Sequence, residues 1–498
     1  MKRPLKNLSY LFGADVLSRL LGFLATTYLA RKLGVDSFGM VGFALAALSY
    51  GLVGCDLGLL KLGTREVAKD RTQAQAYARG VVGLRLILAV IAFTGVCVFA
   101  LLVPRSETTK MLIFAYALAL FPSAMLLEWL FQGVEEMEHI SISRLILYVV
   151  YLALVVIVIR GPEDLLRVPF LWLVGNVASA LYLLIAYRFR IGRFALGFDL
   201  RFWGLLLQGA LPLGIGTVLS QLYVNFGPLA LGLVSTNEAT GLYTAAFRLL
   251  FFLLVVDRMF YAVVFPIVAR KVQASGPLTA EQAYQQSALT MQRLAKLVLL
   301  ISLPIAACTT SLAQPLMTLL FTEKFSAAGP VLGIMAWLVV TTTLNSLYAY
   351  GLIAVGRERE YARNIGLGAL TVVVLTGPLV SLLNARGAAL ALVLGEIAML
   401  GFMFSGFRRV VRVNPLRFAW RPVLVSGALA AMLAWWSPAR IAAWLRSVTS
   451  LGLSTLTLER VVLVAVIVLA IAIYLGIMYL VGGIGQEEFA LLRDRDAR

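Results

Sequence analysis

Long apolar segments recur along the whole chain, with only short polar stretches between them. A helix needs about 20 mainly apolar residues to cross a bilayer, and segments of this kind lie at 9–30, 38–60, 80–103, 110–132, 141–160 and 167–188. After a basic linker, six more lie at 203–233, 240–268, 289–312, 327–354, 360–384 and 387–407. A second basic linker precedes the last two, at 422–443 and 460–482. The pattern predicts an all-α, polytopic membrane protein with about 14 transmembrane helices.

The expected spans fall into groups of six, six and two. This grouping predicts a six-helix lobe over 1–200, a second six-helix lobe over 201–410, and two additional helices with a cytoplasmic tail over 411–498. Two short matches favour a duplication of the lobe, because 35–39 resembles 237–241 at an offset of 202 and 67–69 resembles 268–270 at an offset of 201. Parallel repeats of this kind surround a central cavity in transporters that work by alternating access. We therefore expect such a cavity between the lobes.

Composition excludes several classes of protein. Of the 498 residues, 61% are hydrophobic and only 14% are charged, whereas soluble domains are about 45–50% apolar and about 25% charged. A soluble enzyme, a disordered chain and a nucleic-acid-binding domain are therefore excluded. No connection is long enough to form a catalytic domain, so we do not expect an enzyme. With one histidine and three scattered cysteines, we expect no metal site and no cofactor.

The basic residues predict the topology. Cytoplasmic loops of membrane proteins are enriched in Lys and Arg, and with a cytoplasmic N-terminus the inside segments hold 28 of the 43 basic residues and the outside loops hold 11. Both termini are therefore expected in the cytoplasm, and most of the net charge of +18 is a topology signal. The four remaining basic residues lie inside expected spans: Arg19, Arg85, Arg248 and Arg258.

Ionisable residues inside a membrane cost on the order of 3 kcal/mol and mark candidate functional sites. Asp15 and Arg19 are four residues apart on one helical face. One interpretation is that the two side chains only neutralise each other. The other is that Arg19 faces a water-filled cavity, while Asp15 orients it or exchanges a proton. Arg248 and Arg258 are about 80° apart on an ideal helix and can face one cavity. Two further acids are candidates for ion coupling: Asp257 and Glu396.

Other polar residues lie near the ends of spans or are uncharged. Three charged residues lie near the expected cytoplasmic ends of their spans, at the rim of a cavity: Asp56, Arg85 and Glu128. We expect them to pack against other helices or to snorkel toward water. Hydrogen bonds between helices are the default role of Asn176, Gln208, Gln221, Asn225 and Asn345. Gln221 occupies the position in the second lobe that Arg19 occupies in the first. Gln221 and Asn225 are therefore also candidates for substrate binding.

Three motifs accompany the grouping of six, six and two spans. These are LGVDSFG at 33–39, EWLFQGVEEM at 128–137 and GLYTAA at 241–246. Together they resemble the polysaccharide transporter (Wzx-type, O-antigen flippase) family, within the superfamily that also holds multidrug exporters and lipid II flippases. The resemblance extends over nearly the whole chain, and the tryptophan motif at 128–137 is its most specific part.

The resemblance implies that the protein moves undecaprenyl-diphosphate-linked oligosaccharide, a lipopolysaccharide repeat unit, across the bacterial inner membrane. It implies that Arg19, Arg248 and Arg258 lie in the cavity, where arginines can replace the hydration of a diphosphate. Expected partners are the lipid-linked glycan, membrane lipid, a polysaccharide polymerase and a chain-length regulator, with no nucleic acid, and we expect a monomer. Either H⁺ or Na⁺ would serve as a coupling ion. A cation-coupled multidrug exporter and a lipid II flippase stay open as alternatives.

Overall fold

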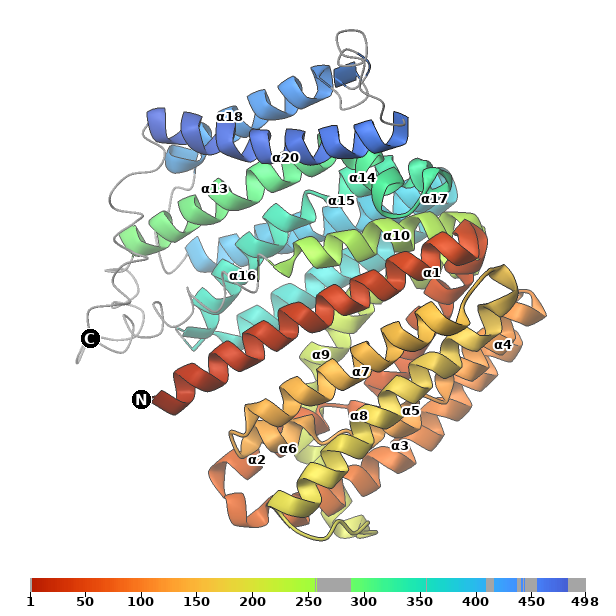
Figure 1. The fold of residues 1–498 in the computed structure, drawn as a ribbon. Helices are drawn as coiled ribbons and strands as arrows, with labels where there is room; N and C mark the ends of the chain where they lie inside the picture. The colour runs from red at the N-terminus through yellow and green to blue at the C-terminus, as the bar shows by residue number, and fades with distance from the viewer. Residues whose placement is uncertain are drawn as a thin grey trace. The chain divides into compact units, whose positions relative to one another are not determined.

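The structure, a computed structural model, describes residues 2–255, 257, 288–354, 356–408, 416–436, 440–441, 443 and 455–481. These residues form α-helices and short 3₁₀ turns, and no strand occurs among them (Figure 1). The expectation of an all-α fold is therefore confirmed.

The helices form two compact units, and the first comprises Met1–Thr244 and Thr376–Ala388. It contains α1 (Lys2–Asp56), α2 (Leu59–Lys69), η1 (Arg71–Gln73), α3 (Ala74–Leu102), α4 (Glu107–Ala117), α5 (Leu120–Ala124), α6 (Glu128–Gly133), α7 (Met137–Val158), η2 (Pro162–Arg167), α8 (Val168–Arg190), α9 (Leu200–Val234) and the start of α10 (Asn237–Leu253).

The second unit comprises Ala245–Leu375 and Ala389–Arg498. Its helices are α13 (Ala288–Ser311), α14 (Ala313–Leu320), η3 (Glu323–Ala328), α15 (Gly329–Met335), α16 (Leu338–Ala354), most of α17 (Glu358–Arg408), α18 (Leu416–Trp435) and α20 (Thr455–Leu480). The division into lobes at 1–200, 201–410 and 411–498 stays a prediction.

Ten helical segments within the described ranges are long and apolar enough to cross a membrane. Two of them hold 44 and 51 residues, about twice what one crossing needs. Each consists of two helical segments joined at one residue with non-helical backbone angles, which is Gly34 (φ 79°) in α1 and Asn384 (φ 49°) in α17. Each of the two covers two of the expected spans. The protein is thus a multi-pass membrane protein, and the count of 14 stays a prediction.

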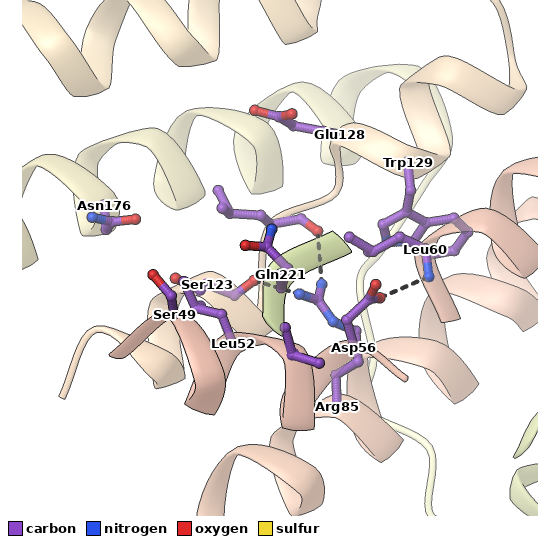
Figure 2. A pocket seen from close by; sticks show the side chains of 12 residues that line it. Ser49, Leu52, Asp56, Leu60, Arg85, Ser123, Glu128, Trp129, Asn176 and Gln221 are labelled. Atoms are coloured by element: carbon purple, nitrogen blue, oxygen red, sulfur yellow. Dashed lines mark hydrogen bonds between the residues drawn. The ribbon is translucent and has the colours of Figure 1, made fainter. Parts of the chain in front are cut away.

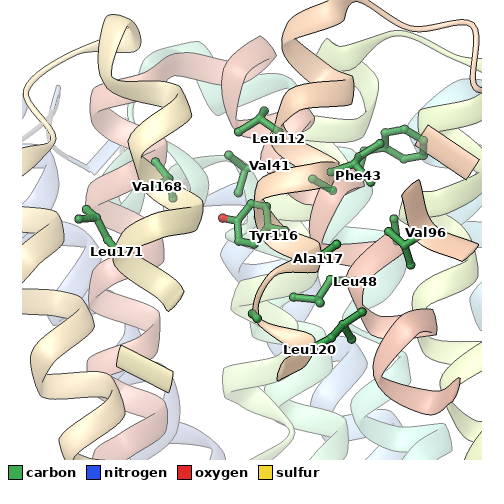
Figure 3. Close-up of a cluster of buried hydrophobic side chains, with 14 of the residues drawn as sticks. Val41, Phe43, Leu48, Val96, Leu112, Tyr116, Ala117, Leu120, Val168 and Leu171 are labelled. Carbon is green, nitrogen blue, oxygen red and sulfur yellow. The ribbon is translucent and has the colours of Figure 1, made fainter. Parts of the chain in front are cut away.

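Apolar side chains fill the first unit and also cover part of its surface. A buried cluster joins α1, α3, α4, α5 and α8, with Phe43, Tyr116 and Leu120 among its members (Figure 3). Large apolar side chains such as Ile157 and Leu181 are exposed instead. An exposed apolar surface of this kind suits contact with lipid, while the helices satisfy their own backbone hydrogen bonds.

The two segments matched by the sequence repeat contact each other. A Cβ atom on Gly39 of α1 would lie 1.9 Å from the main-chain oxygen of Asn237, and one on Gly241 of α10 would lie 2.1 Å from the main-chain oxygen of Val35. Because these contacts involve backbone atoms, only glycine lets the two helices approach so closely.

Candidate functional site

A cavity of about 430 Å³ lies within the first unit. Its polar lining comes from helices that are far apart in the sequence: Ser49, Asp56, Arg85, Ser123, Glu128, Asn176 and Gln221. Figure 2 shows these side chains together with Trp129 and the apolar residues between them. The structure thus brings the three expected rim residues, Asp56, Arg85 and Glu128, to one cavity, and it adds Gln221 to them.

Arg85 is held by main-chain oxygens at the end of α5. Its side chain comes from α3 and is 4% exposed. It donates from Nη2 to the main-chain oxygen of Ser123 (3.0 Å; Figure 2) and from Nη1 to those of Ala124 (3.1 Å) and Leu126 (3.4 Å). Carbonyl groups at a helix end have no partner within the helix, and a cation there is favourable. Arg85 therefore packs in the interior and completes the end of α5, which agrees with the packing role.

Asp56 stabilises the start of the next helix. Its Oδ1 accepts a hydrogen bond of 3.0 Å from the main-chain N–H of Leu60, in the first turn of α2. The chain turns between α1 and α2 through Leu57 and Gly58, both with positive φ. The carboxylate satisfies a free N–H at the helix start and, as Figure 2 shows, lies beside Arg85 in the cavity wall.

A network of four charged side chains extends from the cavity through Glu128. Arg144 of α7 donates to Glu128 from Nη2 to Oε2 (2.8 Å) and from Nε to Oε1 (3.2 Å), the bidentate geometry typical of strong arginine–carboxylate pairs. Arg144 Nη1 also lies 3.5 Å from Asp15 Oδ1. Asp15 in turn accepts a hydrogen bond of 2.8 Å from Arg19 Nε. We call these four residues the charged network.

The charged network contains one contact that the spacing favours and one further residue, while the roles of Asp15 and Arg19 in transport stay predictions. The i,i+4 spacing predicted that Asp15 and Arg19 share a face, and the two form an ion pair. Arg144 was missed because it lies near the start of the span expected at 141–160 and was counted with the preceding loop. Arg144 lies inside the apolar helix α7, which begins at Met137. An earlier start of the expected span would have placed Arg144 among the candidates.

Two of the uncharged candidates, Asn225 and Asn176, form hydrogen bonds within their own helices rather than to another helix as expected. Asn225 Nδ2 donates to the side-chain oxygen of Gln221 (2.8 Å), one turn earlier on α9. Asn176 Nδ2 donates to the main-chain oxygen of Trp172 (2.9 Å) on α8. Gln221 and Asn176 line the cavity, whereas Asn225 is not part of its lining. Asn225 therefore holds the amide of Gln221 in place.

The remaining candidates belong to the second unit. Arg248 is half-buried on α10, and no ion pair or hydrogen bond to its side chain occurs within the described ranges. Asp257 is also half-buried. Arg258 lies outside the described residues. Glu396, on the second half of α17, is 2% exposed and hydrogen-bonded to Thr342 and Asn345 of α16.

The tryptophan motif at 128–137 packs α6 on α2. A Cβ atom on Gly63 would lie 2.5 Å from the Trp129 ring, and one on Gly133 would lie 2.9 Å from Val67. The Thr64 hydroxyl also donates to the main-chain oxygen of Trp129 (3.0 Å). Small residues on both helices thus fix the position of α6, and with it the position of Glu128 at the cavity.

Comparison with known proteins identifies relatives along most of the chain. A family model described as "Polysaccharide biosynthesis protein" matches residues 5–272. A Shigella dysenteriae protein that carries the provisional name O-antigen transporter is 24% identical over 411 residues, which cover 81% of this chain and 100% of the relative. An Escherichia coli (strain K12) protein of the same name is 24% identical over 246 residues, covering 48% of this chain and 59% of the relative.

Two solved structures share the fold. The lipid II flippase MurJ, in an inward closed conformation, has a TM-score of 0.67 and 13% identity over 93% of this chain and 98% of that chain. An inward-facing multidrug resistance transporter of the MATE family and the MOP superfamily has a TM-score of 0.60 and 16% identity over 79% of this chain and 94% of that chain. At these identities the likeness is one of fold.

Proposed function

The chain belongs to the polysaccharide biosynthesis protein family, and from this membership we propose that it is a flippase for lipid-linked oligosaccharide in the bacterial inner membrane. Two relatives provisionally named O-antigen transporters support this function. The same proposal has three further parts. The carrier lipid is undecaprenyl diphosphate, both termini lie in the cytoplasm, and the partners are a polysaccharide polymerase and a chain-length regulator.

The observation that carries the proposal is the charged network beside the cavity. A diphosphate that crosses a membrane needs replacement of its hydration shell, and arginine side chains supply bidentate, charge-assisted hydrogen bonds to phosphate oxygens. Arg19 and Arg144 are two such groups in an apolar helical unit, and carboxylates of Asp15 and Glu128 hold them in place. When the headgroup binds, its phosphate oxygens can replace the carboxylates as acceptors of these hydrogen bonds. The arginines therefore keep an anionic partner throughout.

The oligosaccharide and the lipid tail need different surroundings. The sugar hydroxyls suit a polar lining such as Ser49, Ser123, Asn176 and Gln221. The polyprenyl tail can stay in the bilayer because lipid already solvates it. A cycle of alternating access would then move only the headgroup and the glycan through the protein.

Complementation of a deletion strain tests the proposal. We expect Arg19→Ala and Arg144→Ala to reduce delivery of glycan to the outer leaflet by at least about tenfold, on the basis that one charge-assisted hydrogen bond is worth roughly 1.5–3 kcal/mol. Lipid-linked glycan should accumulate on the cytoplasmic side. Arg167→Ala is the matched control, because Arg167 pairs with Asp164 (2.6 Å) but does not belong to the charged network or the cavity lining.

Two outcomes would contradict the proposal. If both network variants insert normally and export glycan as well as the control does, the charged network does not bind substrate. If deletion of the protein leaves glycan export intact but removes resistance to a cationic drug, the protein is an exporter of the multidrug type.

A further inference from the structure

A buried polar site lies between α16 and the second half of α17, in the second unit. Glu396 of α17 is 2% exposed and Asn345 of α16 is 5% exposed. The Thr342 hydroxyl donates to Glu396 Oε1 (3.2 Å). Asn345 Nδ2 donates both to Glu396 Oε2 and to the main-chain oxygen of Glu396 (3.2 Å). A neutral amide and a neutral hydroxyl are thus among the groups that hold this carboxyl group in an apolar helix.

The side-chain oxygen of Asn345 is a hydrogen-bond acceptor that receives no donor among the described residues. This atom, Oδ1, is buried. A buried acceptor without a donor is costly. A protonated carboxyl group has an O–H donor that an ionised one lacks. Asn345 Oδ1, on the amide that already contacts the carboxyl, is the acceptor that such a donor would satisfy.

We propose that Glu396 is a proton-binding site, with Asn345 and Thr342 as the residues that position its carboxyl group in both protonation states. On uptake, an O–H bond forms between one carboxylate oxygen and a proton from the aqueous phase, and no bond in the protein breaks. In the ionised form the carboxylate accepts from Thr342 and Asn345. In the protonated form its O–H donates to Asn345 Oδ1 after rotation of either side chain.

The ligand chemistry favours a proton over a metal cation. Sodium is bound by several oxygen atoms that point toward the ion, whereas the hydroxyl of Thr342 and the NH₂ group of Asn345 both direct donors at the carboxylate. In the described ranges, no group of three or more acidic, histidine or cysteine side chains could hold a metal ion. One carboxyl group flanked by a hydroxyl and an amide matches the requirements of a proton.

Charged and titratable groups also lie on the elements around this site. On α13, which packs against α16, they are Arg293, Lys296 and Cys308. On α16 they are Tyr348, packed against Phe404 and Phe407, and Tyr350. On α17 itself they are Glu358, Arg359, Glu360, Tyr361, Arg363, Arg386 and Arg408. Glu360 forms an ion pair with Arg357 (3.3 Å). It is therefore an acid on the same helix as Glu396 whose carboxylate has a charged partner.

Protonation at this site would change the hydrogen bonds between two helices. The second half of α17 also packs closely against the first half next to the site, because a Cβ atom on Gly395 would lie 2.1 Å from the Val372 side chain and one on Gly368 would lie 2.7 Å from Met399. A change of hydrogen bonding between closely packed helices is the kind of local event that biases a conformational equilibrium. The coupling of proton uptake to glycan transport rests on the proposed function.

Infrared difference spectroscopy tests the proton site without any substrate. The full-length protein in lipid vesicles is titrated from alkaline to acid buffer, with the probe being the proton alone. We expect a carbonyl stretching band of a protonated carboxylic acid to appear, to be absent from Glu396→Gln, and to persist in the control Glu360→Gln. Asn345→Leu should shift the frequency of the band, because the hydrogen bond to the acid group is lost.

The result that would overturn the proposal is a titration in which the band of Glu396→Gln is the same as that of the unaltered protein. A band that sodium ions abolish at constant pH would equally overturn it, because the site would then bind a metal cation. Asn364→Ala controls for loss of packing, since Asn364 is buried on the same helix and donates to the main-chain oxygen of Phe402 (3.2 Å), and no hydrogen bond from it to a carboxyl group occurs among the described residues.

A measurement of glycan export distinguishes failure of the proton site from failure of the proposed function. If the band belongs to Glu396 and Glu396→Gln exports glycan at a rate that no longer depends on a protonophore, the site couples to transport. If the band belongs to Glu396 but deletion of the protein leaves glycan export unchanged, the proton site stands and the proposed function fails.

Discussion

Replacing Gly39 by alanine tests the close contact between α1 and α10. The added Cβ atom would lie 1.9 Å from the main-chain oxygen of Asn237, whereas ordinary contacts of this kind are 3.4–4 Å. The helices must therefore separate by about 1.5 Å at this point. Rotation of a side chain cannot relieve the clash, because the atoms involved belong to the backbone of α10.

The size of the effect follows from two opposing contributions. Overpacking costs roughly 1–3 kcal/mol, while replacing a helical glycine by alanine gains up to about 1 kcal/mol in helix propensity. Gly95→Ala, on α3, is the matched control because its Cβ atom would meet nothing within 4 Å. Relative to this control, Gly39→Ala should weaken the contact by about 1–3 kcal/mol, which lowers its population roughly 5–150-fold.

Thiol labelling of the purified protein measures this change. With the three native cysteines replaced, a single cysteine is placed at Thr240 of α10, which is 1% exposed. We expect maleimide to react with this cysteine at least about fivefold faster in Gly39→Ala than in Gly95→Ala, in line with the lower limit above. Equal labelling rates and equal melting temperatures in the two variants would refute the argument that backbone contact requires glycine here.

Two further predictions concern arginines that bind main-chain oxygens. Arg85→Leu should lower the free energy of unfolding by about 3 kcal/mol or more and reduce the amount of protein in the membrane, because three oxygens lose a charged donor; a variant with normal Tm but no export would contradict this structural role. Arg105→Leu should lower stability by about 2 kcal/mol, because Arg105 donates to the oxygens of Leu231, Gly232 and Ser235 at the end of α9, whereas an unchanged Tm relative to Arg160→Leu would refute it.

The apolar pattern predicted where helices lie but not how they join. The turn between the first two expected spans is the single non-helical residue Gly34, because one glycine at φ 79° joins two helical segments without a longer loop. The span expected at 110–132 is divided into α4, α5 and α6. Pro122 in α5 is visible in the sequence, but the arginine of α3 that satisfies the end of α5 is a tertiary contact that no local pattern encodes.

The candidate site was predictable only where its contacts are local. The pair of Asp15 and Arg19 follows from a spacing of four residues. The pair of Glu128 and Arg144 joins two helices across a turn, and no spacing rule predicts it. Hydropathy indicates that Asp56 and Glu128 lie near the ends of spans, but it does not indicate that they meet. The structure brings both to one cavity, from α1 and α6.

The balance of charge around the cavity constrains how an anionic headgroup can bind. Arg19 and Arg144 contact Asp15 and Glu128, and Arg85 lies beside Asp56, so three cations are accompanied by three carboxylates. Because Arg85 is occupied by main-chain oxygens, only the arginines of the charged network can exchange one acceptor for another. A diphosphate would therefore displace the carboxylates of Asp15 and Glu128, and each displaced carboxylate must gain water or a proton. On the proposed function, binding of the anion and movement of α1 relative to α6 and α7 would then be parts of one event, since the same arginines join these helices.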